Sequence, residues 1–290
     1  MEAPPDNDVL WARSLHFRYP DGSPGLAEHG SEFYSVAGAE HLAAVLPGFT
    51  CGRVVIGVCG APYKCPPAPS EAALLLHDYL TVRGVRENCE ITIATPFQTP
   101  IPPSPATSEA LLVAFEERGI AFERGHRVAS LEAGRAVLDD GRVLPFDLFL
   151  GVPKHRAPDV VLASGLAEDG YIPVSSQTLS TRFPGVYALG DVATAGVPKA
   201  GVFSEAAARV VAKTLLAVLH GAEPPPPFDG RASCYIEFGA GRVARVDIDF
   251  LSGPTKHGAY HAPTPELVAE KVRFGSSRRE RWFSGIPVPA

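Results

Sequence analysis

The chain has 290 residues, of which 46% are hydrophobic and 20% charged, and its formal net charge is −6. This composition is typical of a folded globular protein and excludes intrinsic disorder and collagen-like repeats. At roughly 100 to 200 residues per domain, the length predicts about two domains. The acidic excess argues against a general nucleic-acid-binding protein, which needs clustered lysine and arginine to contact phosphates. The one basic cluster, residues 271–281, is short.

No apolar run approaches the roughly 20 residues that a membrane-spanning helix needs. Residues 1–5 also lack the basic and then apolar layout of a secretory signal. We therefore expect a cytoplasmic protein, with a peripheral place on the inner membrane as the alternative. The cysteines are too few for a disulfide scaffold and show no CxxC spacing, so we expect no metal site. They are Cys51, Cys59, Cys65, Cys89 and Cys234.

The first half of the chain alternates strand and helix patterns. The β-branched run at residues 53–59 predicts a buried strand, and helical spacing of apolar residues over 70–83 follows a group of prolines. Further elements are predicted as a helix at 35–46, a strand at 90–95, a Pro-rich loop at 96–105 and a helix at 108–118. This order is typical of a doubly wound α/β domain.

After Gly119 the pattern changes to short strands. They are predicted at 120–122, 127–131, 136–138 and 147–150, with a hairpin turn at 139–141. A strand at 185–191 and a long Ala-rich helix at 201–219 follow, and four prolines at 224–227 mark a module boundary. The last elements are predicted as a hairpin of strands 233–238 and 243–250 and an amphipathic helix at 265–274.

The turn after the strand at 53–59 stands where a dinucleotide-binding fold carries GxGxxG. The second glycine of that motif, which lets the backbone approach a pyrophosphate, is Cys59 here. The helix start contains Pro62 and further prolines, which have no N–H to offer a phosphate. The next strand ends at Thr95 instead of an acidic residue that binds a ribose hydroxyl. We therefore expect a Rossmann-like layer without nicotinamide binding, and an ordinary α/β turn explains the glycines as well.

Two segments carry a more specific signal, YKCPPAPSEA at 63–72 and TRFPGVYALGD at 181–191. With KAGVF at 199–203 and Ser233-Cys234-Tyr235, they resemble one branch of the FAD-dependent pyridine nucleotide–disulfide oxidoreductases, that of sulfide:quinone oxidoreductase and flavocytochrome c sulfide dehydrogenase. The resemblance extends from about residue 32 to about residue 250.

The resemblance implies an α/β fold with Rossmann-like FAD/NAD(P)-binding layers of the three-layer ββα type and a small C-terminal α+β segment. Four regions are expected, in chain order. They are a remnant of the first FAD-binding segment with the crossover at 1–50, an NAD(P)-binding-like Rossmann domain at 51–144, a second FAD-binding segment at 145–222 and a C-terminal domain at 223–290.

The same resemblance implies FAD as cofactor and assigns residues to it. Asp191 after Gly190 resembles the aspartate that accepts a hydrogen bond from the flavin ribityl chain. The helix start at Lys199, Ala200 and Gly201 resembles the one whose N–H groups face the flavin ring, where reduction builds negative charge. A Gly-Asp pair at a strand end is also often only a turn. The Lys154-His155-Arg156 turn is expected near the flavin or as a solvated loop.

Cys65 and Cys234 resemble the family's redox-active pair, and a buried packing role is the alternative for each. The implied chemistry is attack of hydrosulfide on their disulfide, followed by transfer of two electrons to FAD. The positive charge of the neighbouring Lys64 would lower the pKa of Cys65 and so favour its thiolate. The alternative is that Lys64 is an ordinary solvated surface lysine. The other three cysteines are expected to be packing residues. His257 and His261 are expected to lie in a C-terminal loop. Binding of an electron acceptor or a metal by these two histidines is the less favoured alternative.

Members of this family begin with a strand, a GxGxxG motif and a helix that hold part of FAD, and this sequence shows no such element. The small-residue turn expected before the crossover is replaced by Ala12-Arg13-Ser14. A truncated gene model, a fragment that pairs with a separate FAD-binding chain and a decayed paralogue all remain open. The leading functional hypothesis is a flavoprotein that oxidises sulfide or a related sulfur compound. The alternative is a flavin-free, non-catalytic α/β module or partner subunit, and an NADH-dependent disulfide reductase is disfavoured.

The expected partners are a small sulfur substrate and a quinone or cytochrome as electron acceptor, with no nucleic acid. Residues 266–283 combine apolar side chains with arginines. This pattern predicts either a helix that packs on its own domain, which we favour, or peripheral contact with a membrane.

Overall fold

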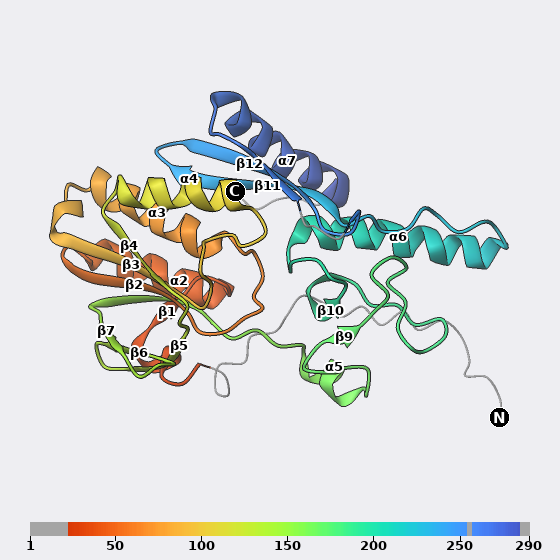
Figure 1. Ribbon diagram of the computed structural model, residues 1–290, viewed down its shortest axis with the longest axis horizontal. Coiled ribbons are helices and arrows are strands. Elements are labelled where there is room, and N and C mark those ends of the chain that lie inside the picture. Colours follow the sequence, from red (N-terminus) through yellow and green to blue (C-terminus); the bar gives the residue numbers. More distant parts are fainter. Residues whose placement is uncertain (1–22, 254–256, 285–290) are drawn as a thin grey trace.

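The computed structural model describes residues 23–253 and 257–284, so the turn expected at Ala12-Arg13-Ser14 lies outside the described residues. A five-stranded parallel sheet with the order β1-β8-β2-β3-β4 is its centre (Figure 1). Its strands are β1 (Ser31–Glu32), β2 (Gly52–Val58), β3 (Cys89–Thr95), β4 (Ile120–Arg124) and β8 (Leu148–Val152). The predicted α/β class is confirmed.

Both faces of the parallel sheet are covered, which explains the unbroken apolar runs of its strands. Val54 and Ile56 of β2 pack toward the helices, whereas Val55 packs with Phe149 on the other face. The helical face carries α2 (Val36–Val45), α3 (Ala68–Val82) and α4 (Pro105–Glu116), with the short 3₁₀ turns Leu46–Gly48 and Arg86–Asn88 between elements. The other face carries α1 (Leu26–His29) and an antiparallel sheet of β5 (Val128–Glu132), β6 (Arg135–Leu138) and β7 (Val143–Pro145). This arrangement confirms the three-layer ββα type.

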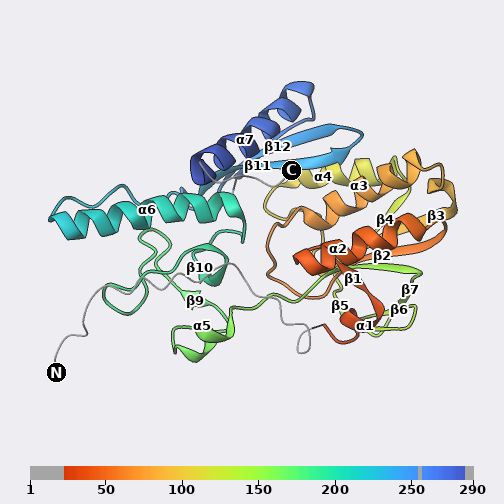
Figure 2. The same cartoon turned by 180° about the vertical axis from the view of Figure 1, so that it is seen from behind.

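The region after β8 contains α5 (Asp159–Ala163), β9 (Ile172–Pro173), the 3₁₀ turn Gly190–Val192, β10 (Ala193–Thr194) and α6 (Gly201–His220). Figure 2 shows α6 on one side of β9, β10 and α5. The strand predicted at 185–191 is wrong. Within the described residues this segment forms one bridge, between Ser180 and Tyr187, and then enters the 3₁₀ turn. A strand needs a neighbour that pairs with its backbone groups, and local sequence does not reveal whether one is present.

The C-terminal region is a three-stranded antiparallel sheet covered by one helix. It comprises β11 (Arg231–Gly239), β12 (Arg242–Asp249), β13 (His257–His261) and α7 (Pro265–Phe283). The predicted hairpin is confirmed. The loop predicted around His257 and His261 is wrong, because these residues pair with Asp249 and Arg245 of β12. The last helix also extends beyond the predicted residue 274 to Phe283.

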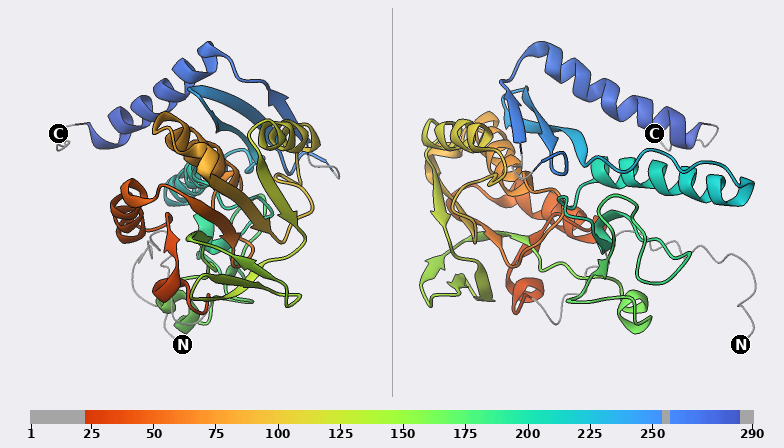
Figure 3. Two further views of the ribbon diagram at one scale, coloured as in Figure 1. Left: turned by 90° about the vertical axis from the view of Figure 1, so that its left-hand side faces the viewer. Right: turned by 45° about the vertical axis from the view of Figure 1, so that its right-hand side comes forward.

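Helix α7 packs back on its own sheet and lies beside α6 (Figure 3). The Tyr235 hydroxyl donates to Glu270 Oε1 at 2.6 Å, and the Tyr235 and Phe274 rings meet edge-on at 5.2 Å. Arg278 Nε donates to Glu205 Oε2 of α6 at 2.7 Å. The favoured expectation for this helix, packing on its own domain, is confirmed. Among the described helices, none has an apolar stretch long enough to cross a bilayer.

Candidate functional site

Cys65 lies in the turn between β2 and α3, at the carboxyl edge of the parallel sheet. Its φ of 58° is in the left-handed region, which residues other than glycine rarely adopt. Two backbone hydrogen bonds hold it there: its N–H donates to the Lys199 carbonyl at 2.8 Å, and its carbonyl accepts from Ala68 N at 2.9 Å. The turn therefore joins the parallel-sheet layer to the start of α6.

Cys234 approaches Cys65 from the C-terminal sheet. Cys234 lies on β11, which is an edge strand of that sheet. Because side chains alternate along a strand, Cys234 points to the same face as Ile236, and this face packs on α3. A negative charge on Cys234 raises the pKa of Cys65, so the two thiols lie within electrostatic reach of each other. Both thiols are free in this structure. Two cysteines separated by 169 positions in the sequence are thus brought near each other by the packing of β11 on α3.

The electrostatic surroundings of the pair keep both thiols protonated at neutral pH. Burial, together with the nearby Glu71 carboxylate, raises the pKa of Cys65 to about 12 and that of Cys234 to about 11. Cys65 nevertheless keeps an exposed surface. Glu71 Oε1 accepts from Glu237 N at 2.8 Å, and burial raises the Glu71 pKa above its ordinary value.

Two features of this charge arrangement were not evident from the sequence. Lys64 is directed toward Tyr34, with its Nζ 3.5 Å from the Tyr34 carbonyl oxygen and 5.7 Å from the ring centroid. Lys271 of α7 is a positive group that lowers the pKa of Cys65. Glu71 is part of the segment 63–72, but nothing in its local sequence indicated a contact with β11.

The raised pKa of Cys234 predicts a loss of stability at alkaline pH. Above the ordinary pKa of a cysteine, near 9, the unfolded chain loses a proton that the folded chain keeps up to about pH 11. The free energy of unfolding should therefore fall by about 1 kcal/mol per pH unit in this window on account of this thiol. Urea titrations between pH 8 and 11 measure it, and Cys234→Ser should make the decline shallower. Parallel declines in both proteins would contradict the assignment.

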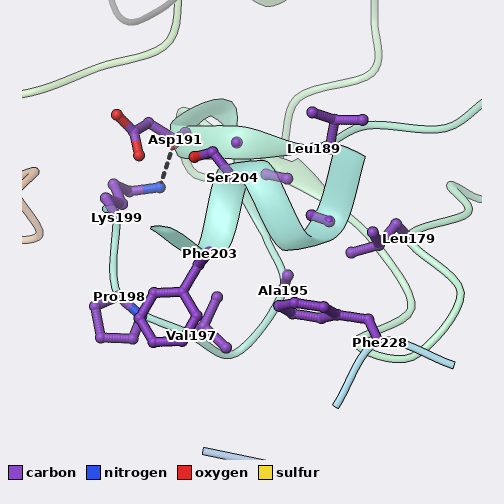
Figure 4. Close-up of a pocket in the computed structure, with 13 residues that line it drawn as sticks. Leu179, Leu189, Asp191, Ala195, Val197, Pro198, Lys199, Phe203, Ser204 and Phe228 are labelled. Carbon is purple, nitrogen blue, oxygen red and sulfur yellow. Dashed lines mark hydrogen bonds between the residues drawn. The ribbon is translucent and has the colours of Figure 1, made fainter. Parts of the chain in front are cut away.

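The second group of predicted residues surrounds Asp191 and Lys199. Lys199 is buried, and its Nζ donates to the backbone oxygen of Asp191 (Figure 4). The Nζ also lies 3.7 Å from the Tyr171 ring centroid. Burial lowers the Lys199 pKa to about 8, and the Asp191 charge opposes that shift. Burial also raises the pKa of Asp191, with Lys199 and Lys64 opposing.

One oxygen of Asp191 has no hydrogen-bond partner among the described residues. This oxygen, Oδ1, is buried, and Figure 4 shows the carboxylate directed away from the apolar side chains of the pocket. An unpaired buried carboxylate oxygen is costly and needs a donor. The α6 helix starts nearby at Gly201, after Ala200, and no side chain caps its first turn. Asp191 Oδ1 could accept a hydrogen bond from a ligand hydroxyl, such as one on the ribityl chain of FAD. The N–H groups at the start of α6 could stabilise negative charge on the ligand, such as that of a reduced flavin ring.

His155 belongs to the turn that sequence analysis placed near this region. Its Nδ1 donates to the Pro153 carbonyl at 2.7 Å, and its ring stands edge-on to Tyr34 at 5.1 Å. Burial lowers the His155 pKa to about 4, and Lys64 and Lys199 contribute to this shift. The ring is therefore buried and neutral at physiological pH, in contrast to the alternative of a solvated loop.

Comparison with known proteins identifies the family. The model of the pyridine nucleotide-disulphide oxidoreductases matches residues 70–214, which is half of the chain. The chain belongs to this family. It is 26% identical to the mitochondrial sulfide:quinone oxidoreductase of Mus musculus over 231 residues, covering 76% of this chain and 51% of that protein. For the protein of the same name from Schizosaccharomyces pombe the identity is 28% over 202 residues, with 66% and 44% covered.

Solved structures agree on the fold. The sulfide:quinone oxidoreductase from Aquifex aeolicus superposes with a TM-score of 0.72 at 20% identity, covering 91% of this chain and 66% of that one. A ferredoxin reductase from Rhodopseudomonas palustris superposes with a TM-score of 0.58 at 19% identity, covering 91% and 68%. The resemblance to the sulfide:quinone oxidoreductase branch is thus supported by sequence and fold. The chain spans about half the length of the curated relatives it matches.

Proposed function

We propose that this chain belongs to an FAD-dependent oxidoreductase that oxidises sulfide or a related small sulfur compound through Cys65 and Cys234. The observation that carries the proposal is the proximity of these two thiols, at a turn whose Cys65 N–H donates to the Lys199 carbonyl. Similarity to mitochondrial sulfide:quinone oxidoreductases supports the same class of substrate. A quinone or a cytochrome is the proposed electron acceptor.

The proposed reaction starts from the disulfide of the pair. A hydrosulfide anion attacks one sulfur, the bond between the cysteines breaks, and a persulfide and a thiolate result. A small thiol then takes the sulfane sulfur as its own persulfide, and loss of two electrons and one proton from the two cysteines restores their disulfide. FAD, when bound, supplies the two-electron acceptor for this step. Cys65 keeps an exposed surface that a small anion can reach, and the raised pKa of Cys234, the thiol displaced by attack at Cys65, makes its thiolate a strong electron donor.

Asp191 and the start of α6 would hold the flavin. Asp191 Oδ1 would accept a hydrogen bond from a hydroxyl, which supplies the donor that this oxygen lacks among the described residues. The first N–H groups of α6 and the buried Lys199 ammonium would stabilise negative charge next to it. Because Cys65 N–H donates to the Lys199 carbonyl, the two groups of residues share one backbone contact.

Anaerobic titration of the FAD-loaded protein with sulfide tests the proposal. We expect loss of the visible flavin absorbance, with about one sulfide consumed per flavin, since each reaction transfers two electrons. A protein that binds no FAD would favour the flavin-free module. A flavin that NADH bleaches while sulfide does not would favour a disulfide reductase.

A further inference from the structure

A second pair of cysteines lies at the edge of the parallel sheet opposite to Cys65. Cys89 is the first residue of β3, and its register partner is Gly52, the first residue of β2. Cys51 directly precedes Gly52 and is exposed. Paired strands lie about 4.8 Å apart and consecutive Cα atoms about 3.8 Å apart, so one step along the strand places the Cα atoms of Cys51 and Cys89 about 6 Å apart. Disulfides join residues whose Cα atoms are about 4.4–6.8 Å apart.

The backbone at Gly52 removes the restriction that strand alternation would impose on this pair. In a regular strand, the Cys51 side chain would point to the face of the sheet opposite to that of Gly52 and Cys89. Gly52 has a φ of 115°, which residues with a side chain rarely adopt, so the chain turns at this residue and Cys51 lies outside the regular strand. The side chain of Cys51 is therefore not held on the opposite face.

The sulfur of Cys89 lies at the same edge of the sheet. Its Sγ donates to the Val85 carbonyl at 3.4 Å, and Val85 belongs to the loop that leads into β3. Burial raises the pKa of Cys89, and a negative charge on Cys51 raises it as well, so the two thiols lie within electrostatic reach of each other.

Two arginines fix the segments that carry the pair. Arg83, at the end of α3, donates to carbonyl oxygens just before Cys51, among them that of Phe49 at 2.8 Å. Arg86 Nη1 donates to the Cys89 carbonyl oxygen. Both thiols are free in this structure, with Cys51 open to solvent and Cys89 only 5% exposed. An oxidant therefore reaches Cys51 first, and Cys89 is held next to it.

We propose that Cys51 and Cys89 form a site of reversible oxidation by hydroperoxides, in which a disulfide joins the starts of β2 and β3. The Cys51 thiolate attacks one oxygen of the peroxide, the O–O bond breaks, and a sulfenic acid forms while hydroxide leaves and takes up the proton that the thiol had lost. The Cys89 sulfur then attacks the sulfenic sulfur, and its proton leaves with the sulfenic oxygen as a second water. Two electrons thus pass from the two thiols to the peroxide. The inference goes beyond the proposed function, because it involves no flavin, no sulfide and no residue of the Cys65 site.

Peptide mapping without reductant tests the inference on the folded protein. The protein is treated with hydrogen peroxide, the peroxide is removed, the remaining thiols are alkylated with iodoacetamide in urea, and the digest is analysed by mass spectrometry. We expect a peptide that links Cys51 to Cys89 and that dithiothreitol splits. Cys59, which is 2% exposed and lies beyond the other end of β2, is the internal control and should be recovered alkylated.

Single variants separate the two steps. In Cys89→Ser the sulfenic acid on Cys51 has no thiol partner, so dimedone, which reacts with sulfenic acids, should label Cys51. In Cys51→Ser the buried Cys89 should remain a thiol and be recovered alkylated. Folded wild-type protein with Cys51 as sulfinic acid and Cys89 alkylated would overturn the inference. Two unmodified thiols after the treatment, or a linked peptide that forms only when the peroxide acts in urea, would overturn it as well.

Discussion

Replacing either cysteine of the pair by serine should lower sulfide-dependent flavin reduction by at least about 1,000-fold, the scale of losing a covalent catalytic group. In Cys65→Ser and Cys234→Ser no disulfide can form between the two positions, and hydrosulfide loses its electrophile. Stopped-flow measurement of flavin absorbance after mixing with sulfide gives the rate. Both variants should still bind FAD, because neither thiol belongs to the residues assigned to the flavin.

Cys51→Ser is the matched control for this experiment. Cys51 is exposed and lies just before β2, whereas Cys65 follows the other end of that strand, so the two are at opposite edges of the parallel sheet. Its variant should reduce flavin at the wild-type rate. If Cys234→Ser also reacted at the wild-type rate, the pair would have no part in the reaction and the proposed mechanism would be wrong.

The sequence was a good guide wherever one segment determines its own structure. The apolar run of β2 must be buried on both faces, and this requirement alone predicts a parallel sheet covered by other layers. The Ala-rich pattern of α6 and the Gly239-Ala240-Gly241 turn likewise contain their own signals, and the structure has both elements there.

Errors arose where a distant neighbour decides the outcome. The run from Gly185 to Asp191 is as apolar as a strand, yet pairing among the described residues is confined to Tyr187. His257 and His261 have no strand-like alternation of their own, but β12 offers its free edge and they pair with it. Strand formation depends on such partners more than helix formation does.

The candidate site shows the same division. The motif around Cys65 and the segment that ends at Asp191 are local patterns, and the resemblance that they carry drew attention to both. The carboxylate that raises the pKa of Cys65 belongs to Glu71, at the i+6 position on α3, and the thiol that raises it as well belongs to Cys234, 169 positions away in the sequence. The Nζ of Lys64, the neighbour in sequence, lies 3.5 Å from the Tyr34 carbonyl oxygen.

Asp191 illustrates how a binding residue can cost stability in the protein that carries it. Its pKa is raised by burial, and its Oδ1 lacks a donor among the described residues. A carboxylate whose pKa is higher in the folded state than in the unfolded state destabilises the fold at neutral pH. Such a residue is explained if a ligand supplies the missing donor, because affinity for that ligand then repays the cost.

Asp191→Ala should therefore weaken FAD binding by about 10- to 150-fold, the range expected for losing a hydrogen bond of about 1.5–3 kcal/mol to a charged group. Fluorescence titration with FAD measures the affinity. The flavin-free variant should unfold at the same temperature as wild type or at a higher one, because an unsatisfied buried oxygen has been removed. Asp159→Ala, at the exposed start of α5, is the control and should bind FAD like wild type. Unchanged FAD affinity in Asp191→Ala, or a large drop in its unfolding temperature, would show that the carboxylate supports the fold and not the flavin.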